Sequence, residues 1–327
     1  MSELDLRTLG STGLTVTRLG LGLAALGRPA YINLGREQDY GGDRTVAAME
    51  QRCHELVDAA YAAGIRYIDT ARSYGFAEAF LGRWLTRREP WRDSPTVGSK
   101  WGYSYVGSWQ LDASVHEVKD LSVETLRRQI AESRALLGAR LGLYQIHSAT
   151  IESGVLDDGR VLDELERLRS QGLAIGATVT GPAQGDIIRR LLDVNTKRAC
   201  LFQVVQATWN LLEPSAGPAL ADAKAMGLGV IVKEAVANGR LTKRNTSEEA
   251  SLLHRYADAH HTSPDVVAMA AALSNPWVDV VLSGAVTIEQ LASNLRAGDL
   301  AAIAGDWPDI AEPPHEYWAR RRLLAWH

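Results

Sequence analysis

A carboxylate, a tyrosine and a lysine stand at positions from which they could carry out proton transfer. Asp69 lies near the end of an apolar run over residues 66–71, and Tyr74 follows in the turn sequence Ser73-Tyr74-Gly75. A buried carboxylate needs a partner, and the next apolar run, residues 96–100, ends in Lys100. A free phenol has a pKa of about 10, so a nearby cation that lowers this pKa would make Tyr74 a proton donor. The spacing therefore indicates an active site.

The elements that must position these residues form a regular alternation of strand and helix signals. Gly64, Gly172 and Gly227 each stand where a helix C-cap would precede a strand. Eight strands alternating with helices predict an α/β fold, a (β/α)8 TIM barrel that residues 1–327 form as one domain. A doubly wound open sheet is the main alternative, but residues 20–25 lack the third glycine of a dinucleotide fingerprint. The strands are expected at residues 18–24, 66–71, 96–100, 143–148, 174–178, 202–207, 229–234 and 278–283.

Seven of these strands carry a polar residue near the carboxyl end, on the face that would point into the barrel. Active sites of such barrels lie at this C-terminal mouth. The sequence therefore predicts that seven side chains surround one site: Asp69, Lys100, His147, Thr178, Gln206, Lys233 and Ser283.

Segments outside the alternation have their own expected places. Residues 6–9 and 14–17, around the turn sequence Gly10-Ser11-Thr12-Gly13, predict an N-terminal β-hairpin that plugs the barrel floor. Residues 28–47 and 101–120 form long loops at the C-terminal face, where such loops shape binding sites. Their aromatic residues, and one after the sixth strand, are expected to wall the substrate pocket, with Tyr31, Trp101 and Trp209 as the named candidates.

Composition excludes several classes of protein. The chain has 327 residues with 46% hydrophobic and 23% charged residues and a net charge of −4, and no dense Lys/Arg run suggests nucleic acid. The short basic segment 320–322 is expected to be a solvated face. Cys53 and Cys200 lack the spacing of a zinc site, so no metal is expected. With no signal peptide and no apolar run of roughly 20 residues, we expect a cytoplasmic protein without a membrane partner.

The motif Asp69-Thr70-Ala71-x-x-Tyr74-Gly75, with Lys100 on the next strand and His147 in Tyr144-Gln145-Ile146-His147-Ser148, resembles the aldo-keto reductase superfamily. The resemblance spans nearly the whole chain. It implies a barrel that binds a nicotinamide cofactor, usually NADPH, without a Rossmann domain and that reduces aldehydes or ketones. It also implies a catalytic tetrad of Asp69, Tyr74, Lys100 and His147, with Tyr74 as proton donor and Lys100 held charged by Asp69. His147 would either orient the carbonyl oxygen or, when protonated, assist Tyr74.

This sequence departs from the family pattern around the implied cofactor. Val179 replaces a common carboxamide-binding Asn, and Lys233 replaces an aromatic residue that usually stacks on the nicotinamide. Lys233 is expected either to reach the cofactor pyrophosphate or to pair with Glu234. Gln290 stands where many members bind the 2′-phosphate with Arg, so NADH is a second candidate cofactor. The cofactor contacts implied by the resemblance are Thr178, Gln206, Lys233, Gly239, Leu241, Ser283, Gly284, Ala285, Thr287, Gln290 and Asn294.

Three functions stay open at this point. The first is reduction of a small aldehyde, ketone or sugar by NAD(P)H, and the second is oxidation of a sugar or alcohol by the same site. The third is a nucleotide-sensing regulatory subunit with little turnover. The sequence sets neither the physiological substrate nor the oligomeric state.

Overall fold

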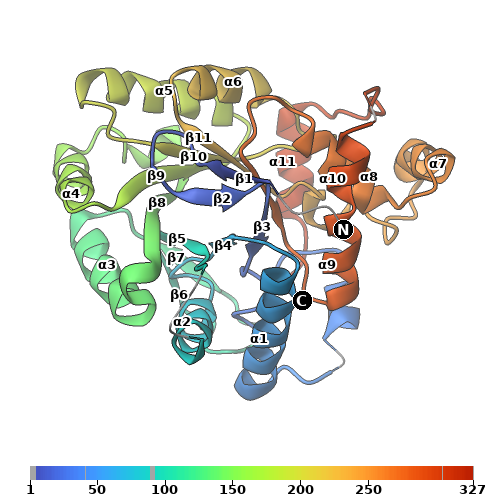
Figure 1. Ribbon diagram of the computed structural model, residues 1–327, viewed down its shortest axis with the longest axis horizontal. Coiled ribbons are helices and arrows are strands. Elements are labelled where there is room, and N and C mark those ends of the chain that lie inside the picture. The colour runs from blue at the N-terminus through green and yellow to red at the C-terminus, as the bar shows by residue number, and fades with distance from the viewer. Residues whose placement is uncertain (1–4, 41, 89–92, 304, 327) are drawn as a thin grey trace.

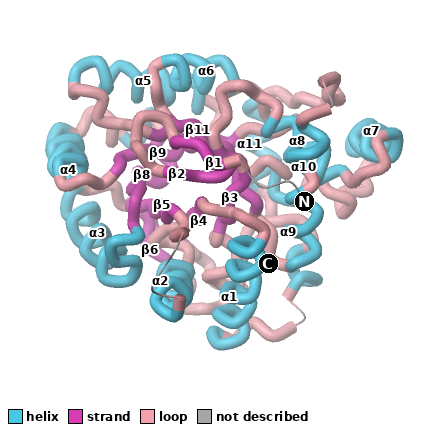
Figure 2. Tube along the Cα trace, viewed as in Figure 1, coloured by secondary structure: helices cyan, strands magenta, loops and turns pink. Residues whose placement is uncertain are grey.

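The computed structural model describes residues 5–40, 42–88, 93–303 and 305–326. Within these residues, eight parallel strands close into a barrel in the order β10-β11-β12-β3-β4-β5-β8-β9, and helices surround it (Figures 1 and 2). The predicted (β/α)8 TIM barrel is confirmed, and each of its strands lies within two residues of an expected run. The barrel strands are β3 (Leu19–Gly22), β4 (Tyr67–Asp69), β5 (Thr96–Trp101), β8 (Leu141–Ala149), β9 (Ala174–Val179), β10 (Val204–Thr208), β11 (Gly229–Lys233) and β12 (Val280–Ser283).

The helices cover the barrel because each buries one apolar stripe against the strands. Helix α1 (Val46–Ala62), for example, buries Met49, Cys53 and Leu56. Gly64, Gly172 and Gly227 have positive φ angles of 95°, 87° and 85°, which confirms them as points where the chain leaves a helix. The other helices are α2 (Ala77–Arg87), α3 (Val123–Leu137), α4 (Gly159–Ser170), α5 (Gln184–Lys197), α6 (Gly217–Ala225), α7 (Ser251–Ala259), α8 (Pro264–Leu273), α9 (Ile288–Leu295), α10 (Ala297–Ala301) and α11 (Pro314–Arg322). Short 3-10 turns are η1 (Arg36–Asp39), η2 (Gly138–Arg140), η3 (Ile151–Ser153), η4 (Ala237–Gly239) and η5 (Glu248–Ala250).

The N-terminal hairpin closes one end of the barrel, as predicted. Strands β1 (Leu6–Thr8) and β2 (Thr15–Thr17) pair antiparallel, and Figure 1 shows them lying across the barrel strands. Leu9 and Val16 are fully buried and pack with inward-facing residues of the barrel such as Tyr67 and Leu143. Apolar side chains therefore seal the floor, and the polar strand ends lie at the opposite mouth.

The long loop after β5 contains structure that the sequence did not reveal. Strands β6 (Tyr103–Tyr105) and β7 (Glu117–Lys119) form a separate antiparallel pair. Ile32 forms an isolated bridge with Trp326, near the C-terminal end of the chain. This bridge joins the loop over residues 28–47 to the segment after α11. Glu117 of β7 pairs with Arg28, and His116 stacks on Trp326, so three segments that are distant in sequence meet at a cavity. No helix in the described ranges is long and apolar enough to cross a membrane.

Candidate active site

The centre of the site is a buried ion pair between neighbouring strands. Lys100 Nζ of β5 donates to Asp69 Oδ1 of β4 and to the Thr70 carbonyl oxygen at 2.9 Å. The two charged side chains are 1% and 3% exposed. The second carboxylate oxygen, Asp69 Oδ2, accepts from Tyr67 Oη at 3.2 Å and from Gln206 Nε2 at 3.0 Å. The donors on both oxygens offset the desolvation of the Asp69 carboxylate.

Tyr74 and His147 lie beside this pair. Their rings meet edge to face with centroids 5.5 Å apart, and Lys100 Nζ lies 4.8 Å from the centre of the Tyr74 ring. The structure thus brings together the four residues of the expected tetrad. Ser73 Oγ lies 3.4 Å from His147 Nδ1, on the loop that carries Tyr74.

The protonation states of these two rings follow from their surroundings. Burial, with the Asp69 charge next in size, raises the pKa of Tyr74 well above its ordinary value. Burial outweighs the lowering effect of nearby cations, so the pKa of the phenol lies above its ordinary value, contrary to the expectation from sequence. Burial, followed by the charges of Lys100 and Arg28, lowers the pKa of His147 well below its ordinary value. Tyr74 is accordingly a neutral phenol and His147 a neutral imidazole at pH 7.

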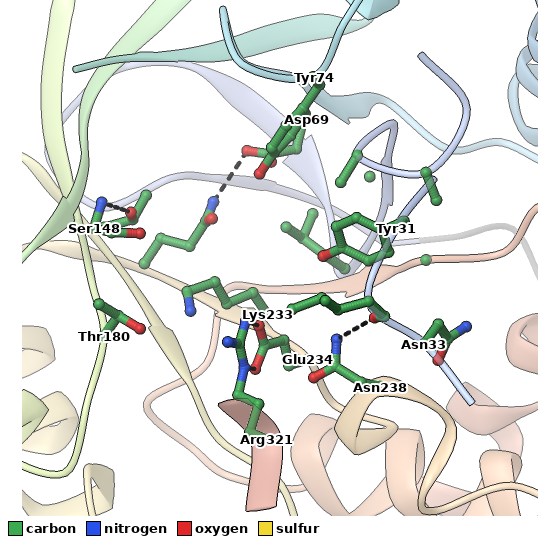
Figure 3. A pocket seen from close by; sticks show the side chains of 18 of the residues that line it. Tyr31, Asn33, Asp69, Tyr74, Ser148, Thr180, Lys233, Glu234, Asn238 and Arg321 are labelled. Carbon is green, nitrogen blue, oxygen red and sulfur yellow. Dashed lines mark hydrogen bonds and ion pairs between the residues drawn. The ribbon is translucent and has the colours of Figure 1, made fainter. Parts of the chain in front are cut away.

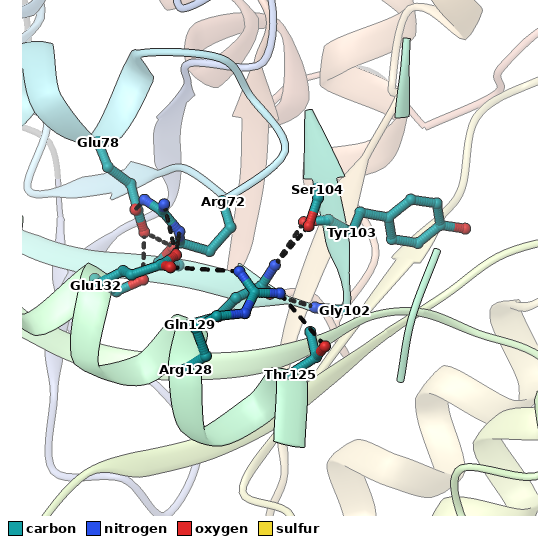
Figure 4. Close-up of polar contacts among 11 residues, drawn as sticks. Arg72, Glu78, Gly102, Tyr103, Ser104, Thr125, Arg128, Gln129 and Glu132 are labelled. Carbon is teal, nitrogen blue, oxygen red and sulfur yellow. Dashed lines mark hydrogen bonds and ion pairs between the residues drawn. The ribbon is translucent and has the colours of Figure 1, made fainter. Parts of the chain in front are cut away.

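The loop that carries Tyr74 is anchored by a second buried carboxylate, on helix α2 (Figure 4). Glu78, 2% exposed, accepts from Ser99 Oγ of β5 at 2.6 Å and from Ser133 Oγ of α3 at 2.7 Å. It also pairs with Arg72, two residues before Tyr74. Gln129 of α3 fixes the neighbouring loop, because it accepts from Gly102 N at 2.8 Å and donates to the carbonyl of Tyr103 at 3.0 Å.

A cavity of about 400 Å³ opens at the mouth of the barrel above these residues. Figure 3 shows side chains from several strands and from the C-terminal helix α11 converging on it. The sequence-predicted site residues that line it are Tyr31, Asp69, Tyr74, His147, Thr178, Gln206, Lys233, Ser283 and Gly284.

Two of the residues predicted as substrate contacts, Trp101 and Trp209, lie outside the cavity lining. Trp101 is fully buried and does not line the cavity. It follows Lys100 on β5, and because neighbouring residues of a strand point to opposite faces, an inward lysine places Trp101 outside the barrel. Trp209 packs edge to face against Trp277 at a centroid distance of 5.9 Å.

The residues expected around the cofactor carboxamide are held in internal contacts. Thr178 Oγ1 accepts from the backbone N–H of Ser148 at 2.7 Å, and Gln206 binds Asp69 as described above. Val179 is fully buried in the core. Lys233 does not pair with Glu234, because Glu234 forms a bidentate contact with Arg321 of α11. Instead, Lys233 Nζ donates to Thr208 Oγ1 at 2.8 Å.

The residues expected around the rest of the cofactor lie in two places. The first is the turn between β12 and α9, where Ser283 Oγ donates to Asn294 Oδ1 at 2.7 Å and Thr287 caps the helix. On α9, Gln290 accepts from Val286 N at 3.0 Å and donates to Asp39 Oδ1 at 2.9 Å. The residues of this turn and of α9 that do not line the cavity are Ala285, Thr287, Gln290 and Asn294. The second place is the loop after β11, where Leu241 is buried and Gly239 packs on Asn33. Leu241 and Gly239 both lie outside the cavity lining.

Several residues that line the cavity were not predicted from the sequence. Arg28 is 2% exposed, pairs with Glu117 of β7 at 2.7 Å, and lies 4.9 Å from the centre of the Trp326 ring. Thr180 and Asn33 complete the wall. Arg28, Asn33 and Glu117 all lie in the long loops 28–47 and 101–120 that are expected to shape the binding site, and this was the available signal. Nothing local marked the pairing of Arg28 with Glu117 across 89 residues.

Arg321 corrects an expectation about the C-terminal basic segment. Its side chain is 19% exposed and binds Glu234, which is 8% exposed, so it is not part of a solvated face. Its neighbour Arg320 is 45% exposed and pairs with Glu312 and Glu249. Helix α11 therefore presents Arg321 and Arg322 to the cavity and turns Arg320 outward.

Two unpaired acceptors indicate that the cavity wall can hold a nucleotide cofactor. Asn33 Oδ1 and Asn238 Oδ1 are buried without a hydrogen-bond partner in the described structure, and both residues line the cavity. Buried polar atoms of this kind are normally satisfied, and ribose hydroxyl groups would supply donors. No group of three or more His, Cys, Asp or Glu residues in the described ranges is placed to hold a metal ion.

Comparison with known proteins decides the family. The model of the aldo/keto reductase family matches residues 18–312. The chain belongs to the aldo/keto reductase family. Its activity class is therefore NAD(P)H-dependent oxidoreduction.

Individual relatives of this reductase cover most of both chains. It is 26% identical to the L-galactose dehydrogenase of Arabidopsis thaliana over 95% of this chain and 94% of that one. A putative aldo-keto reductase from Pseudomonas aeruginosa superposes with a TM-score of 0.66 at 25% identity, covering 91% and 95% of the two chains. The holo form of an aldo-keto reductase from Bacillus halodurans shares the fold with a TM-score of 0.69 at 22% identity, covering 99% and 97%.

Proposed function

We propose that this reductase transfers a hydride between a nicotinamide cofactor and the carbonyl carbon of a small aldehyde, ketone or sugar, with Tyr74 as the proton donor. The observation that carries the proposal is the buried Asp69–Lys100 pair, which lies beside Tyr74 and His147 and below the cavity at the barrel mouth. This places a neutral proton donor and a neutral hydrogen-bonding ring next to a fixed cation, as reduction of a carbonyl requires.

Each residue has a chemical task in this mechanism. The bound cofactor supplies the hydride. His147, being neutral, donates a hydrogen bond that orients the carbonyl oxygen; its lowered pKa supports this orienting role over the protonated one. Tyr74 gives its proton to that oxygen as negative charge develops there. Lys100 then stabilises the tyrosinate, because a cation near a phenolate lowers its free energy, and Asp69 holds Lys100 in place.

The oxidative direction is the second candidate. The same residues run the reaction backwards when Tyr74 starts as the base, and one relative is named a dehydrogenase of L-galactose. The polar walls of the cavity, with Arg28, Glu117 and Asn33, suit a substrate with several hydroxyl groups. Initial rates in both directions at pH 7 distinguish the two directions.

Tyr74→Phe tests the proposed chemistry. The variant keeps the ring but lacks the proton, so turnover should fall by about two to four orders of magnitude, while the Kd of the cofactor stays within about twofold. Tyr256→Phe, on the outer helix α7, is the control and should behave as wild type. The measurements are steady-state reduction of a carbonyl panel and quenching of tryptophan fluorescence by NADPH and NADH.

The outcomes separate the open functions. Near-wild-type turnover of Tyr74→Phe would refute Tyr74 as the donor. Tight cofactor binding by the wild type with negligible turnover over the whole panel would favour a nucleotide-sensing role instead.

A further inference from the structure

Two cations that line the cavity, Lys233 and Arg322, have no carboxylate at ion-pair distance among the described residues, and of these two Lys233 is the one whose charge acts on His147. Arg28 is paired with Glu117, and Arg321 is paired with Glu234. Within the described ranges Lys233 has no carboxylate partner at ion-pair distance; its recorded hydrogen bond goes to Thr208 Oγ1 at 2.8 Å. An ammonium group has three N–H donors, so two remain for a ligand. In Figure 3 the side chain extends into the cavity.

The charge of Lys233 acts directly on the reacting centre. It is one of the cations that lower the pKa of His147, and Lys100 and Asp69 in turn act on Lys233. If Tyr74 and His147 hold the carbonyl oxygen, the hydride donor has to enter this same cavity to reach the adjacent carbon. The nicotinamide ring and the Lys233 ammonium must therefore share one partly enclosed space.

The two redox forms of the ring differ in charge there. The oxidised ring carries one positive charge and the reduced ring carries none. A fixed ammonium without an ion-pair partner repels the oxidised ring, and the repulsion is stronger in a cavity than in bulk water. It can also donate a hydrogen bond to the carboxamide oxygen of the ring.

We propose that Lys233 makes this site bind the reduced, uncharged nicotinamide in preference to the oxidised, cationic ring. The inference rests on the proposed function and deepens it. Release of the oxidised cofactor is then favoured after each reduction, and the reductive direction becomes the preferred one.

The preference should depend on pH. Burial lowers the pKa of Lys233 to about 8, against the opposing effect of Glu234. Below this pH the ammonium repels the oxidised ring; above it the neutral amine does not. Raising the pH from 7 to 9.5 should therefore tighten binding of the oxidised cofactor and leave the reduced cofactor nearly unchanged. The charged or titratable groups that act on Lys233 or feel its charge are Asp69, Lys100, His147, Glu234 and Arg321.

The test is the ratio of two dissociation constants, measured by isothermal titration without any substrate. Oxidised and reduced forms of one nucleotide share their phosphates and adenosine, so contacts to those parts cancel in the ratio. For the wild type at pH 7 we expect the oxidised form to bind at least about tenfold more weakly, which corresponds to 1.4 kcal/mol. Lys233→Met should bring the ratio to within about threefold of one and abolish its dependence on pH.

Two further variants control the experiment. Lys233→Arg retains the charge and should retain the preference at pH 7. Lys243→Met removes an exposed lysine outside the cavity and should match the wild type. A Lys233→Met ratio within twofold of the wild-type ratio would overturn the inference and leave the proposed function standing. If the wild type binds none of NAD+, NADH, NADP+ and NADPH, the proposed function and the inference are both overturned.

Discussion

At the residue scale, the Asp69 carboxylate is the point on which the site depends. It accepts hydrogen bonds from Lys100, Tyr67 and Gln206. These three donors come from three different strands, β5, β4 and β10. A carboxylate held in this way is fixed in orientation as well as in charge. The position of the Lys100 ammonium under the Tyr74 ring therefore follows from the barrel strands rather than from the flexible lysine stem.

Lys100→Met should remove the stabilisation of the Tyr74 anion while keeping a side chain of similar length. We expect turnover to fall by about hundredfold or more, and the free energy of unfolding to fall by about 3–5 kcal/mol, because Asp69 loses its charged partner. Single-turnover hydride transfer and urea unfolding measure the two effects. Wild-type turnover in the folded variant would contradict the role given to Lys100.

Gln290 gives a residue-scale prediction on cofactor choice. Its amide binds Asp39, which also pairs with Arg244, so an acidic group lies beside the position implied for the 2′-phosphate. Gln290→Arg adds a cation there and should tighten NADPH binding by about tenfold relative to NADH. Fluorescence titration with both nucleotides measures the ratio; an unchanged ratio would place the 2′-phosphate elsewhere.

The proximity of the four residues of the expected tetrad was predictable because each lies near the carboxyl end of a barrel strand or in the loop after it. The partners that complete the cavity were beyond reach, since Glu117 and Arg28, or Arg321 and Glu234, are joined only by the folded chain. Trp101 lies outside the cavity lining for a local reason: neighbouring residues of a strand alternate in direction, and the inward residue of this strand is Lys100.

At the element scale, the loop after β4 keeps its shape because α2, α3 and β5 converge on Glu78. The strands of the barrel were predictable because buried parallel strands are apolar runs with polar ends. The β6–β7 pair was not, because its residues are partly exposed and carry no such run. Short exposed strands take their structure from the neighbours they cover.

Glu78→Ala tests this convergence. The change leaves Arg72, Ser99 and Ser133 without their common acceptor, so the free energy of unfolding should fall by about 3–5 kcal/mol. The matched control is Glu124→Ala, which removes an exposed pair with Arg160 in the first turn of α3 and should cost only a small part of the loss expected for Glu78→Ala. Equal losses in the two variants, measured by urea unfolding, would contradict an anchoring role for Glu78.

At the scale of the whole molecule, the barrel separates stability from chemistry by placing them at opposite ends. The floor is closed by the N-terminal hairpin with apolar side chains, and the mouth holds paired charges around a cavity. A change at the floor should therefore alter the stability of the fold and leave cofactor affinity unchanged, provided that the protein remains folded.

Gly10 and Gly13 of the hairpin turn allow this separation to be measured. Both have positive φ angles, 50° and 75°, so alanine is strained at either position. At Gly10 a Cβ atom would also lie 2.0 Å from the backbone nitrogen of Gly229, whereas at Gly13 it would meet nothing within 4 Å. Gly13→Ala should cost about 1 kcal/mol of unfolding free energy, and Gly10→Ala about 2–4 kcal/mol, because the hairpin must also move away from β11. Both folded variants should bind cofactor with the wild-type Kd, and a weakened Kd in Gly10→Ala would show that the floor and the mouth are coupled through the strands.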